Sequence, residues 1–202
     1  MPLKMLVKSK NIISKVMAVT EANNNNQQQP DVIVTEQCTN EFADDKEKTL
    51  IKSIGYIING KTTHYYSYGN FNLVRLIIHL LKQTGPANVF MTSYSFSQTS
   101  IEQILNHRQK GNILSFRVLI DNRVKTMSPI PFQMLSTAFD YRCSSIHAKV
   151  ALIWNDAWNI SIVTSQNATD NPKMERGTIF TDIQTFNFDK NALENEFKRG
   201  TA

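Results

Sequence analysis

Regular alternation of apolar and polar residues begins near Thr49 and predicts strands and helices in turn. Ser53–Ile58 is predicted to be a strand, Asn59-Gly60 is typical of a type I′ turn, and Thr62–Tyr66 is predicted to be the returning strand. Apolar residues then recur at helical spacing, namely Leu73, Leu76, Ile77, Leu80 and Leu81. Gly85-Pro86 ends this helix. The pattern therefore predicts a hairpin followed by a helix.

A strand, a helix and a second strand follow in that order. Asn88–Ser93 is apolar and predicts a strand, and Gln98–Gln109 has the apolar spacing of a helix. Gly111 breaks the helix, and Ile113–Ile120 predicts a buried strand. Strand, helix and strand in this sequence are typical of a βαβ unit, in which the two strands are parallel.

The last third of the chain continues the mixture of elements. A helix is expected over Phe132–Phe139, after a loop that contains proline. Strands are expected over Ile146–Trp154, Trp158–Thr164 and Gly177–Thr181, and a helix over Asn191–Lys198 closes the chain. The fold class that we expect is α/β, with a central mixed β-sheet flanked by helices on both faces.

The first part of the chain has a different composition. Asn23–Pro30 reads NNNNQQQP, a polar tract that cannot bury apolar surface. Asp31–Phe42 contains enough apolar residues for an edge strand, and Phe42–Lys48 is charged and predicts a loop. We therefore expect an N-terminal extension over residues 1–48, partly low-complexity and flexible, and one folded domain over residues 49–202.

Composition and charge narrow the class of protein. Of the 202 residues, 41% are hydrophobic and 19% are charged, which is an ordinary globular balance, and the net charge of +5 favours a polyanionic partner such as nucleic acid. Cys38 and Cys143 are far apart, so the sequence indicates neither a zinc site nor a disulfide framework. No apolar run approaches the ~20 residues that span a bilayer. We expect a soluble, cytoplasmic protein without a cofactor or metal ion.

Candidate chemistry is concentrated between Ile146 and Phe180. His147 and Lys149 are two residues apart on a predicted strand, so their side chains share one face. If this strand and the next form a hairpin, Ser165 and Asn167 at the end of the second lie beside His147. Glu175 starts the following strand and reaches the same end. Because an unpaired lysine is costly to bury, Lys149 requires an anion, either a carboxylate or a phosphate.

Three segments within this stretch resemble a known superfamily. HAK, TSQN and NPKMERG are similar to the signature of the phospholipase D superfamily, which is H-x-K, then G-[GS]-x-N, then a downstream carboxylate. FMTSYSF and GNILSFRVLIDN resemble the leading βαβ unit of that superfamily. The similarity covers Leu50–Arg199 and is strongest to its small, single-motif, bacterial endonuclease-like members. It implies a phospholipase D-like sandwich.

Two positions depart from the superfamily signature. Trp154 stands where the superfamily has an aspartate, and the nearest acidic residue is Asp156 in the following turn. Thr164 stands where the superfamily has the first glycine of G-[GS]-x-N. A threonine fits this position only if the backbone does not need a positive φ.

The resemblance implies a role for each matching residue. His147 attacks phosphorus and forms a phosphohistidine, so it must be neutral at the attacking nitrogen. Glu175 accepts a hydrogen bond from the other ring nitrogen and fixes the tautomer. Lys149 and Asn167 bind the non-bridging phosphate oxygens, and Ser165 adds a hydroxyl donor.

Other residues are candidates for the surroundings of this site. Ser93, Tyr94 and Ser95 end a predicted strand that points towards the site, and they either line a phosphate groove or are ordinary polar residues of a strand end. A basic group follows the predicted helix and either tracks phosphates or forms a solvated surface: Arg108, Lys110, Arg117, Arg123 and Lys125.

The superfamily mechanism uses a second histidine as acid and base. His64, His79 and His107 each lack a lysine two residues later, so the chain has a single motif. His79 also fits a packed position in its helix. A mechanism with two histidines therefore implies a homodimer whose sites meet across the two-fold axis, each subunit supplying His147.

The resulting hypothesis is a metal-independent phosphodiesterase, a nuclease that cleaves DNA or RNA as a homodimer. One alternative is a catalytically inactive relative that binds nucleic acid or has a structural role, in which His147, Lys149 and Glu175 form a polar cluster. Another is a hydrolase of phospholipids or other phosphodiesters, which would need a deep apolar pocket. The sequence alone leaves the three open.

Overall fold

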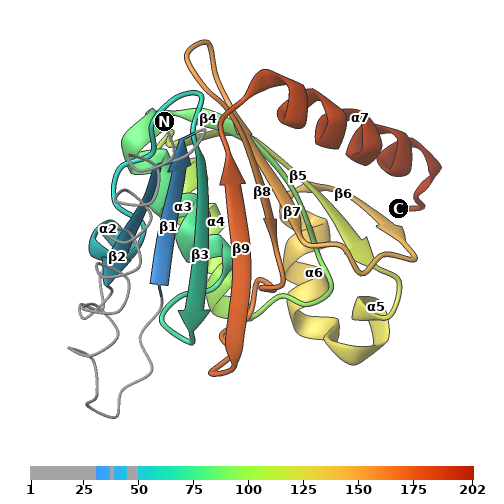
Figure 1. The fold of residues 1–202 in the computed structure, drawn as a ribbon. Coiled ribbons are helices and arrows are strands. Elements are labelled where there is room, and N and C mark those ends of the chain that lie inside the picture. Colours follow the sequence, from blue (N-terminus) through green and yellow to red (C-terminus); the bar gives the residue numbers. More distant parts are fainter. Residues whose placement is uncertain (1–30, 37–38, 45–49) are drawn as a thin grey trace, which may run out of the picture.

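In the computed structural model, which describes residues 31–36, 39–44 and 50–202, the strands form one sheet (Figure 1). The strand order is β2-β1-β3-β9-β8-β7-β4-β5-β6. The strands are β1 (Asp31–Glu36), β2 (Thr39–Asp44), β3 (Thr62–Tyr68), β4 (Ala87–Ser93), β5 (Ile113–Asp121), β6 (Asp140–Ser144), β7 (Val150–Trp154), β8 (Asn159–Thr164) and β9 (Met174–Phe180). The helices are α2 (Leu50–Ser53), α3 (Leu73–Thr84), α4 (Gln98–Gln109), α5 (Val124–Met127), α6 (Pro129–Ala138) and α7 (Ile183–Arg199).

The sheet is mixed, as the sequence predicts. Strands β4, β5 and β6 are parallel to one another, and the other neighbouring pairs are antiparallel. Helix α4 connects β4 to β5, so the predicted βαβ unit is confirmed. Ser97 caps this helix by accepting a hydrogen bond from the backbone N–H of Ser100 at 3.2 Å.

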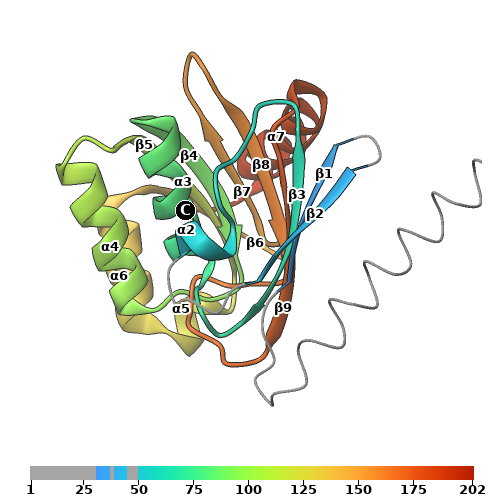
Figure 2. The same cartoon turned by 60° about the vertical axis from the view of Figure 1, so that its left-hand side comes forward.

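Helices cover both faces of the sheet, which confirms the predicted fold class. Figure 2 shows α3, α4 and α6 on one face and α7 on the other. Alternate residues of each strand face opposite sides, so Ala151 and Ile153 of β7 belong to the core under α3 and α4. Leu152, between them, faces α7. The core under α7 consists of Phe90, Leu119, Leu152, Phe186, Leu193 and Phe197.

The predicted hairpin at the start of the domain is wrong. Residues 54–58 form no strand, and Ile54 and Ile57 are buried as parts of a loop. The backbone N–H of Ile57 donates to Gln83 Oε1 at 2.9 Å instead of to a neighbouring strand. Strand β3 itself is present, but it pairs with β1 on one side and β9 on the other. Both of its edges are therefore occupied by segments far away in sequence.

The predicted extension contributes two strands to the sheet. Strand β1 pairs with β3, and β2 pairs with β1 at the edge. Residues 42–44 belong to β2, so the loop predicted from Phe42 is wrong for these residues. The polar tract at residues 23–30 and Cys38 lie outside the described residues. The domain boundary at residue 49 stays a prediction.

Several element boundaries also differ from those predicted. Helix α6 begins at Pro129, and α7 begins at Ile183, where Asp182 accepts a hydrogen bond from the backbone N–H of Thr185 at 2.7 Å. Strand β6 and helix α5 were not predicted from the sequence. Strand β7 begins at Val150, so His147 and Lys149 lie in the extended segment before it. This segment is held by Thr92, whose hydroxyl donates to the carbonyl of Ala148 at 2.5 Å.

The end of the chain pairs with the outer strand β6. The backbone N–H of Cys143 donates to the carbonyl of Thr201 at 2.7 Å, and the N–H of Thr201 donates back to Cys143 at 3.0 Å. Gly200 permits this approach, because a Cβ there would lie 2.7 Å from Cβ of Arg142. Cys143 is a buried free thiol. None of the helices in the described ranges is long and apolar enough to cross a bilayer.

Candidate active site

The predicted histidine and lysine lie where β7 begins and β4 ends. The side chain of His147 is exposed, whereas Lys149 is only 8% exposed. The Lys149 ammonium donates to the carbonyl of His147 at 2.9 Å and lies 3.2 Å from His147 Nδ1. It also lies 3.4 Å from His147 Nε2, so the ammonium faces both nitrogens of the ring. The buried ammonium and the exposed imidazole are therefore in direct contact.

Lys149 is a buried cation without an ion-pair partner among the described residues. Burial lowers the pKa of its ammonium below the usual value, and the negative charge of Glu175 opposes that change. A buried charge is stabilised when an anion binds beside it. The site is thus suited electrostatically to an anionic group next to His147.

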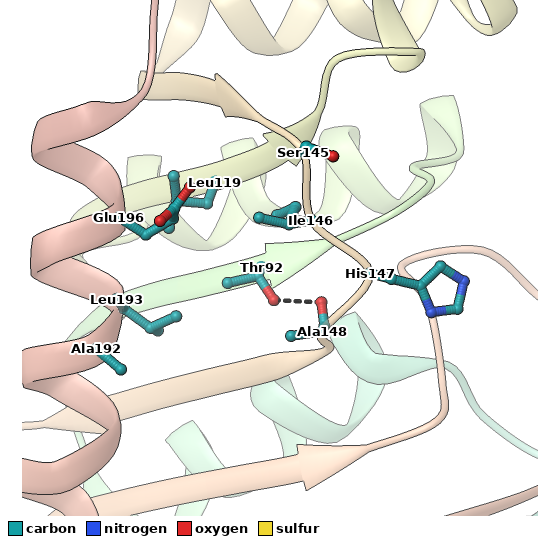
Figure 3. Close-up of a pocket in the computed structure, with 9 residues that line it drawn as sticks. All are labelled: Thr92, Leu119, Ser145, Ile146, His147, Ala148, Ala192, Leu193 and Glu196. Atoms are coloured by element: carbon teal, nitrogen blue, oxygen red, sulfur yellow. Dashed lines mark hydrogen bonds between the residues drawn. The ribbon is translucent and has the colours of Figure 1, made fainter.

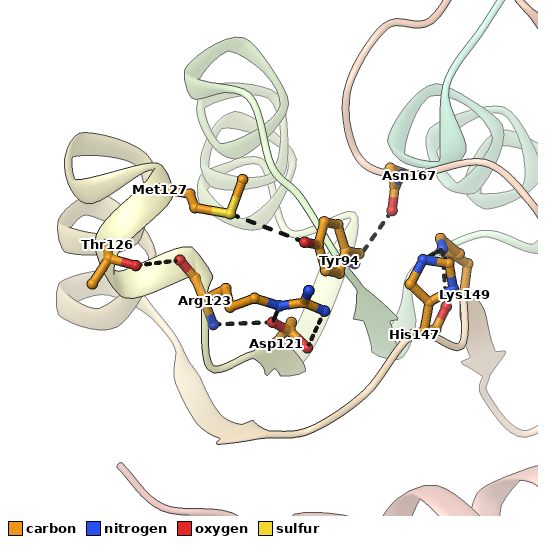
Figure 4. A network of polar contacts seen from close by, with 8 residues as sticks. All are labelled: Tyr94, Asp121, Arg123, Thr126, Met127, His147, Lys149 and Asn167. Atoms are coloured by element: carbon orange, nitrogen blue, oxygen red, sulfur yellow. Dashed lines mark hydrogen bonds and ion pairs between the residues drawn. The ribbon is translucent and has the colours of Figure 1, made fainter.

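Asn167 reaches the same place from the loop after β8. Its side-chain carbonyl oxygen accepts a hydrogen bond from the backbone N–H of Tyr94 at 3.3 Å. This contact orients the amide of Asn167, whose NH₂ group is then the end available to a phosphate oxygen. Figure 4 shows His147, Lys149 and Asn167 on one side of Tyr94.

Ser165 and Glu175 bond to each other. The hydroxyl of Ser165 donates to the carboxylate of Glu175, and Asn171 Nδ2 donates to the same carboxylate at 2.6 Å. The structure does not place Glu175 in a hydrogen bond with the imidazole. Glu175 acts on the site through its charge near Lys149. The implied roles of Ser165 and Glu175 therefore stay predictions.

Ser93 has a different position from the one expected. Its side chain is completely buried, and its hydroxyl accepts from the backbone N–H of Ala168 at 3.0 Å and donates to the carbonyl of Ser95 at 2.8 Å. These bonds join the end of β4 to the loop that carries Asn167. The structure thus gives Ser93 a part in positioning that loop and does not expose it to a phosphate.

The loop that carries Asn167 is anchored by a buried tyrosine. The hydroxyl of Tyr65 donates to Gln166 Oε1 at 2.8 Å and lies 3.1 Å from Thr164 Oγ1. Burial raises the pKa of Tyr65, so this hydroxyl stays protonated. Thr164 is the last residue of β8 and has extended backbone, so the condition for replacing glycine at this position is met.

Gly177 makes room for the ring of Tyr65. The two residues face each other across β3 and β9. A Cβ on Gly177 would lie 2.3 Å from Cζ and Oη of Tyr65. Any larger residue at position 177 would therefore displace the tyrosine that holds the loop.

Trp154, at the position of the superfamily aspartate, lies on the other face of the sheet. Its ring is 6.0 Å from the ring of Phe186 in α7, and the ammonium of Lys190 lies 4.8 Å from its centroid. Asp156 is exposed in the turn between β7 and β8 and does not replace the aspartate at the site. Position 154 has therefore become part of the apolar contact with α7.

Asp121 was not assigned to the site from the sequence, whereas Tyr94 and Arg123 were candidates among strand-end and basic residues. The ring centroid of Tyr94 is 5.3 Å from that of His147, and the guanidinium of Arg123 lies 4.6 Å from the Tyr94 centroid (Figure 4). Asp121 accepts from Arg123 Nε at 2.8 Å and from the backbone N–H of Ile146. These bonds hold the pKa of Asp121 below its usual value. Tyr94 follows β4 and Asp121 ends β5. Because β4 and β5 were predicted to be parallel, their carboxyl ends lie side by side, and this was the signal in the sequence that could have placed both residues near the site.

A cavity of about 360 Å³ lies between the site segment and α7. Its lining is mainly apolar and includes Leu119, Ile146, Ala148 and Leu193. Figure 3 shows the imidazole of His147 pointing away from the other lining residues. In the described part of the chain, no group of three or more His, Cys, Asp or Glu residues is arranged to hold a metal ion.

Comparisons with known proteins identify the fold. No family profile and no curated protein matches the sequence. Two structures are similar over nearly their whole length. They are Nuc of Salmonella typhimurium, a phospholipase D family member (14% identity, 69% of this chain and 96% of that chain, TM-score 0.53), and NucT of Helicobacter pylori (14% identity, 70% of this chain and 99% of that chain, TM-score 0.53). Polyphosphate kinase of Porphyromonas gingivalis is similar over 75% of this chain and 28% of that chain (14% identity, TM-score 0.52).

Proposed function

Because the chain has the phospholipase D superfamily fold, we propose that it is a metal-independent phosphodiesterase that cleaves nucleic acid through a phosphohistidine. The observation that carries this proposal is the exposed imidazole of His147 beside a buried lysine that has no carboxylate partner in the described residues. The amide of Asn167 lies on the same side of Tyr94 (Figure 4).

The proposed reaction has two steps. A ring nitrogen of His147 bonds to phosphorus while the bond from phosphorus to the leaving oxygen breaks, and a second histidine protonates that oxygen. The same histidine then takes a proton from water, which attacks phosphorus and frees His147. Lys149 and Asn167 stabilise the charge that grows on the non-bridging oxygens. The contact between the Lys149 ammonium and the imidazole supports this pairing of a nucleophile with a cation.

The second histidine is proposed to come from a partner subunit. The remaining histidines have other contacts: His64 with Thr178, His79 with Gln83, and His107 with Asn112. Exposed apolar side chains on the α7 side of the sheet support a homodimer: Val163, Met174, Ile183 and Phe188. Burying them between two copies would remove their apolar surface from water.

Subunit mixing tests the shared site. Adding excess His147→Ala protein to wild type converts wild-type subunits into heterodimers with one histidine per site. The activity per wild-type subunit is then expected to fall towards zero as the excess increases. Unchanged activity per wild-type subunit, with exchange verified by differently tagged subunits, would show that each chain works alone.

The reaction itself is tested with single- and double-stranded DNA and RNA in the presence of EDTA. Wild type is expected to cleave at least one of them, and acid quench should trap a phosphorylated protein that His147→Ala does not form. His107→Ala is the matched control, because His107 bonds to Asn112 at the end of α4. No cleavage by wild type, or equal cleavage by His147→Ala, would refute the proposal.

A second candidate is a non-catalytic module that binds nucleic acid. It is favoured by the bonding of Glu175 to Ser165 and Asn171, which leaves the imidazole without the expected carboxylate. This candidate predicts that tungstate, a phosphate analogue, still raises the melting temperature of wild type but not of Lys149→Ala, while no substrate is cleaved. A lipid hydrolase would instead cleave phospholipid vesicles, with its substrate entering the apolar cavity of Figure 3.

A further inference from the structure

Of the basic residues after β4, Arg123 differs from the others in how it is held. Arg117 is paired with Glu194 and packs against Phe90 and Phe197 under α7. Arg108 donates to the carbonyl of Ala138 and lies over Phe139, away from the site. Arg123 instead lies beside Tyr94, next to the candidate site.

The guanidinium of Arg123 is fixed in place but exposed. Its Nε donates to Asp121 Oδ1 at 2.8 Å and Nη2 lies 3.4 Å from Oδ2, while the ring of Tyr94 lies under the group. The side chain of Asp121 is 3% exposed, whereas that of Arg123 is 60% exposed. None of its described contacts involves Nη1. A planar, oriented guanidinium with a free edge is suited to a phosphate group.

Tyr94 fixes the distance between this guanidinium and the reactive histidine. Arg123 contacts the Tyr94 ring at 4.6 Å, and the ring of His147 lies 5.3 Å from the same centroid. Figure 4 shows Tyr94 between Arg123 and the His147–Lys149 pair. Phosphates recur roughly every 3.4 Å along the axis of one nucleic acid strand. The two contacts with the Tyr94 ring put Arg123 and His147 within about 10 Å of each other, so a strand whose scissile phosphate contacts His147 can bring a nearby phosphate of the same strand to Arg123.

We propose that Arg123, positioned by Asp121 and Tyr94, is a subsite for a phosphate adjacent to the scissile one in a nucleic acid strand. This inference rests on the proposed phosphodiesterase activity and adds a reason for substrate choice. A phospholipid or simple diester that has a single phosphodiester gains nothing from Arg123. The subsite therefore favours nucleic acid over other phosphodiesters.

The test compares two substrates in one set of variants. Bis(4-nitrophenyl) phosphate has one phosphate, whereas a short oligothymidine has several. In Arg123→Gln, the ratio of kcat/KM for oligothymidine to that for the single diester is expected to fall about tenfold, mainly through KM, because a charge-assisted contact is lost. Arg123→Lys should recover part of the ratio, since it keeps the charge without the planar geometry.

Salt dependence gives a second, independent readout. One phosphate contact to a single strand contributes about 0.7 to the slope of log affinity against log salt concentration. Arg123→Gln is expected to reduce the magnitude of the slope for oligothymidine by about that amount. Arg108→Gln is the matched control, because it removes another exposed arginine that lies over an aromatic ring.

The outcomes separate this inference from the proposed function. If wild type cleaves both substrates and Arg123→Gln lowers both equally, Arg123 acts only through the fold of the site, and the subsite is refuted. An unchanged ratio, or an equal effect of Arg108→Gln, also refutes it while leaving the phosphodiesterase intact. If wild type cleaves neither substrate, the proposed function fails and the subsite fails with it.

Discussion

Replacing Gly177 with alanine connects core packing to the candidate site. The new Cβ would lie 2.3 Å from Cζ and Oη of Tyr65, a side chain that is completely buried. The ring cannot move without changing its hydroxyl contacts with Thr164 and Gln166. Because Gln166 precedes Asn167, the substitution is expected to displace the proposed phosphate-binding amide as well as to destabilise the fold.

Two terms determine the size of the effect. Overpacking a well-packed core costs about 2 kcal/mol. Loss of the bond from Tyr65 leaves the buried Gln166 oxygen without that donor, which costs about 2 kcal/mol more. The free energy of unfolding should therefore fall by about 4 kcal/mol. For a chain of this size that corresponds to a melting temperature roughly 8–16 °C lower.

Thermal unfolding of two further variants tests this reasoning. Gly60→Ala is the control, because a Cβ there meets nothing within 4 Å. Its free energy of unfolding should fall only by the strain of a residue with a Cβ at φ +79°, about 1–2 kcal/mol. In the second, Tyr65→Leu is combined with Gly177→Ala and removes the ring atoms that clash with the new methyl group. We expect the double variant to be about 4 kcal/mol more stable than the sum of the two single effects predicts, because it has no clash and because the lost hydrogen bond is counted in both single variants. A Gly177→Ala protein as stable as Gly60→Ala, or additive single effects, would refute the clash.

Three further predictions concern charges in and near the site. Lys149→Met removes a buried ammonium and should raise the free energy of unfolding by about 1 kcal/mol while abolishing diester cleavage; a melting temperature below wild type contradicts this. Trp154→Asp restores the superfamily residue but should lower stability by about 3 kcal/mol in urea unfolding without restoring activity, because the ring contacts of Trp154 with Phe186 are lost. Hydrogen bonds from Arg123 hold the pKa of Asp121 below its usual 3.8, so the ionised carboxylate stabilises the fold above pH 3.8 and this contribution is lost as pH falls through the folded pKa. Asp121→Asn should therefore lose less stability than wild type over that range, measured as melting temperature against pH, and parallel curves would contradict the assignment.

Sequence patterns predicted the elements whose contacts are local. Helix α3 has apolar residues at helical spacing and ends at Gly85, and the βαβ unit around α4 follows from three consecutive segments. His147, Lys149 and Asn167 were found because short motifs carry them. These residues come together because β7 and β8 pair in antiparallel fashion. That pairing is the simplest arrangement for two consecutive strands joined by a short turn.

Features that depend on distant partners were not predicted. Residues 54–58 look like a strand because Ile54 and Ile57 are apolar, but they are buried as parts of a loop whose backbone bonds to Gln83. Strand β6 is short and partly polar, so its sequence lacks a clear strand pattern. It pairs in parallel with β5, and no local hairpin marks its position. Arg123 was one of several basic residues in the sequence, and only the fold brings it to Tyr94 and, through that ring, to His147.

Pairing of Thr201 with Cys143 has a consequence for self-association. An outer strand presents free backbone N–H and C=O groups, which are a template for pairing with another chain and for aggregation. At β6 those groups of Cys143 are already bonded to Thr201, and the close approach at Gly200 keeps the added segment against the strand. Gly200 and Thr201 thus cover the outer edge of β6 at Cys143, and deleting them would leave this backbone free to pair with another copy of the chain.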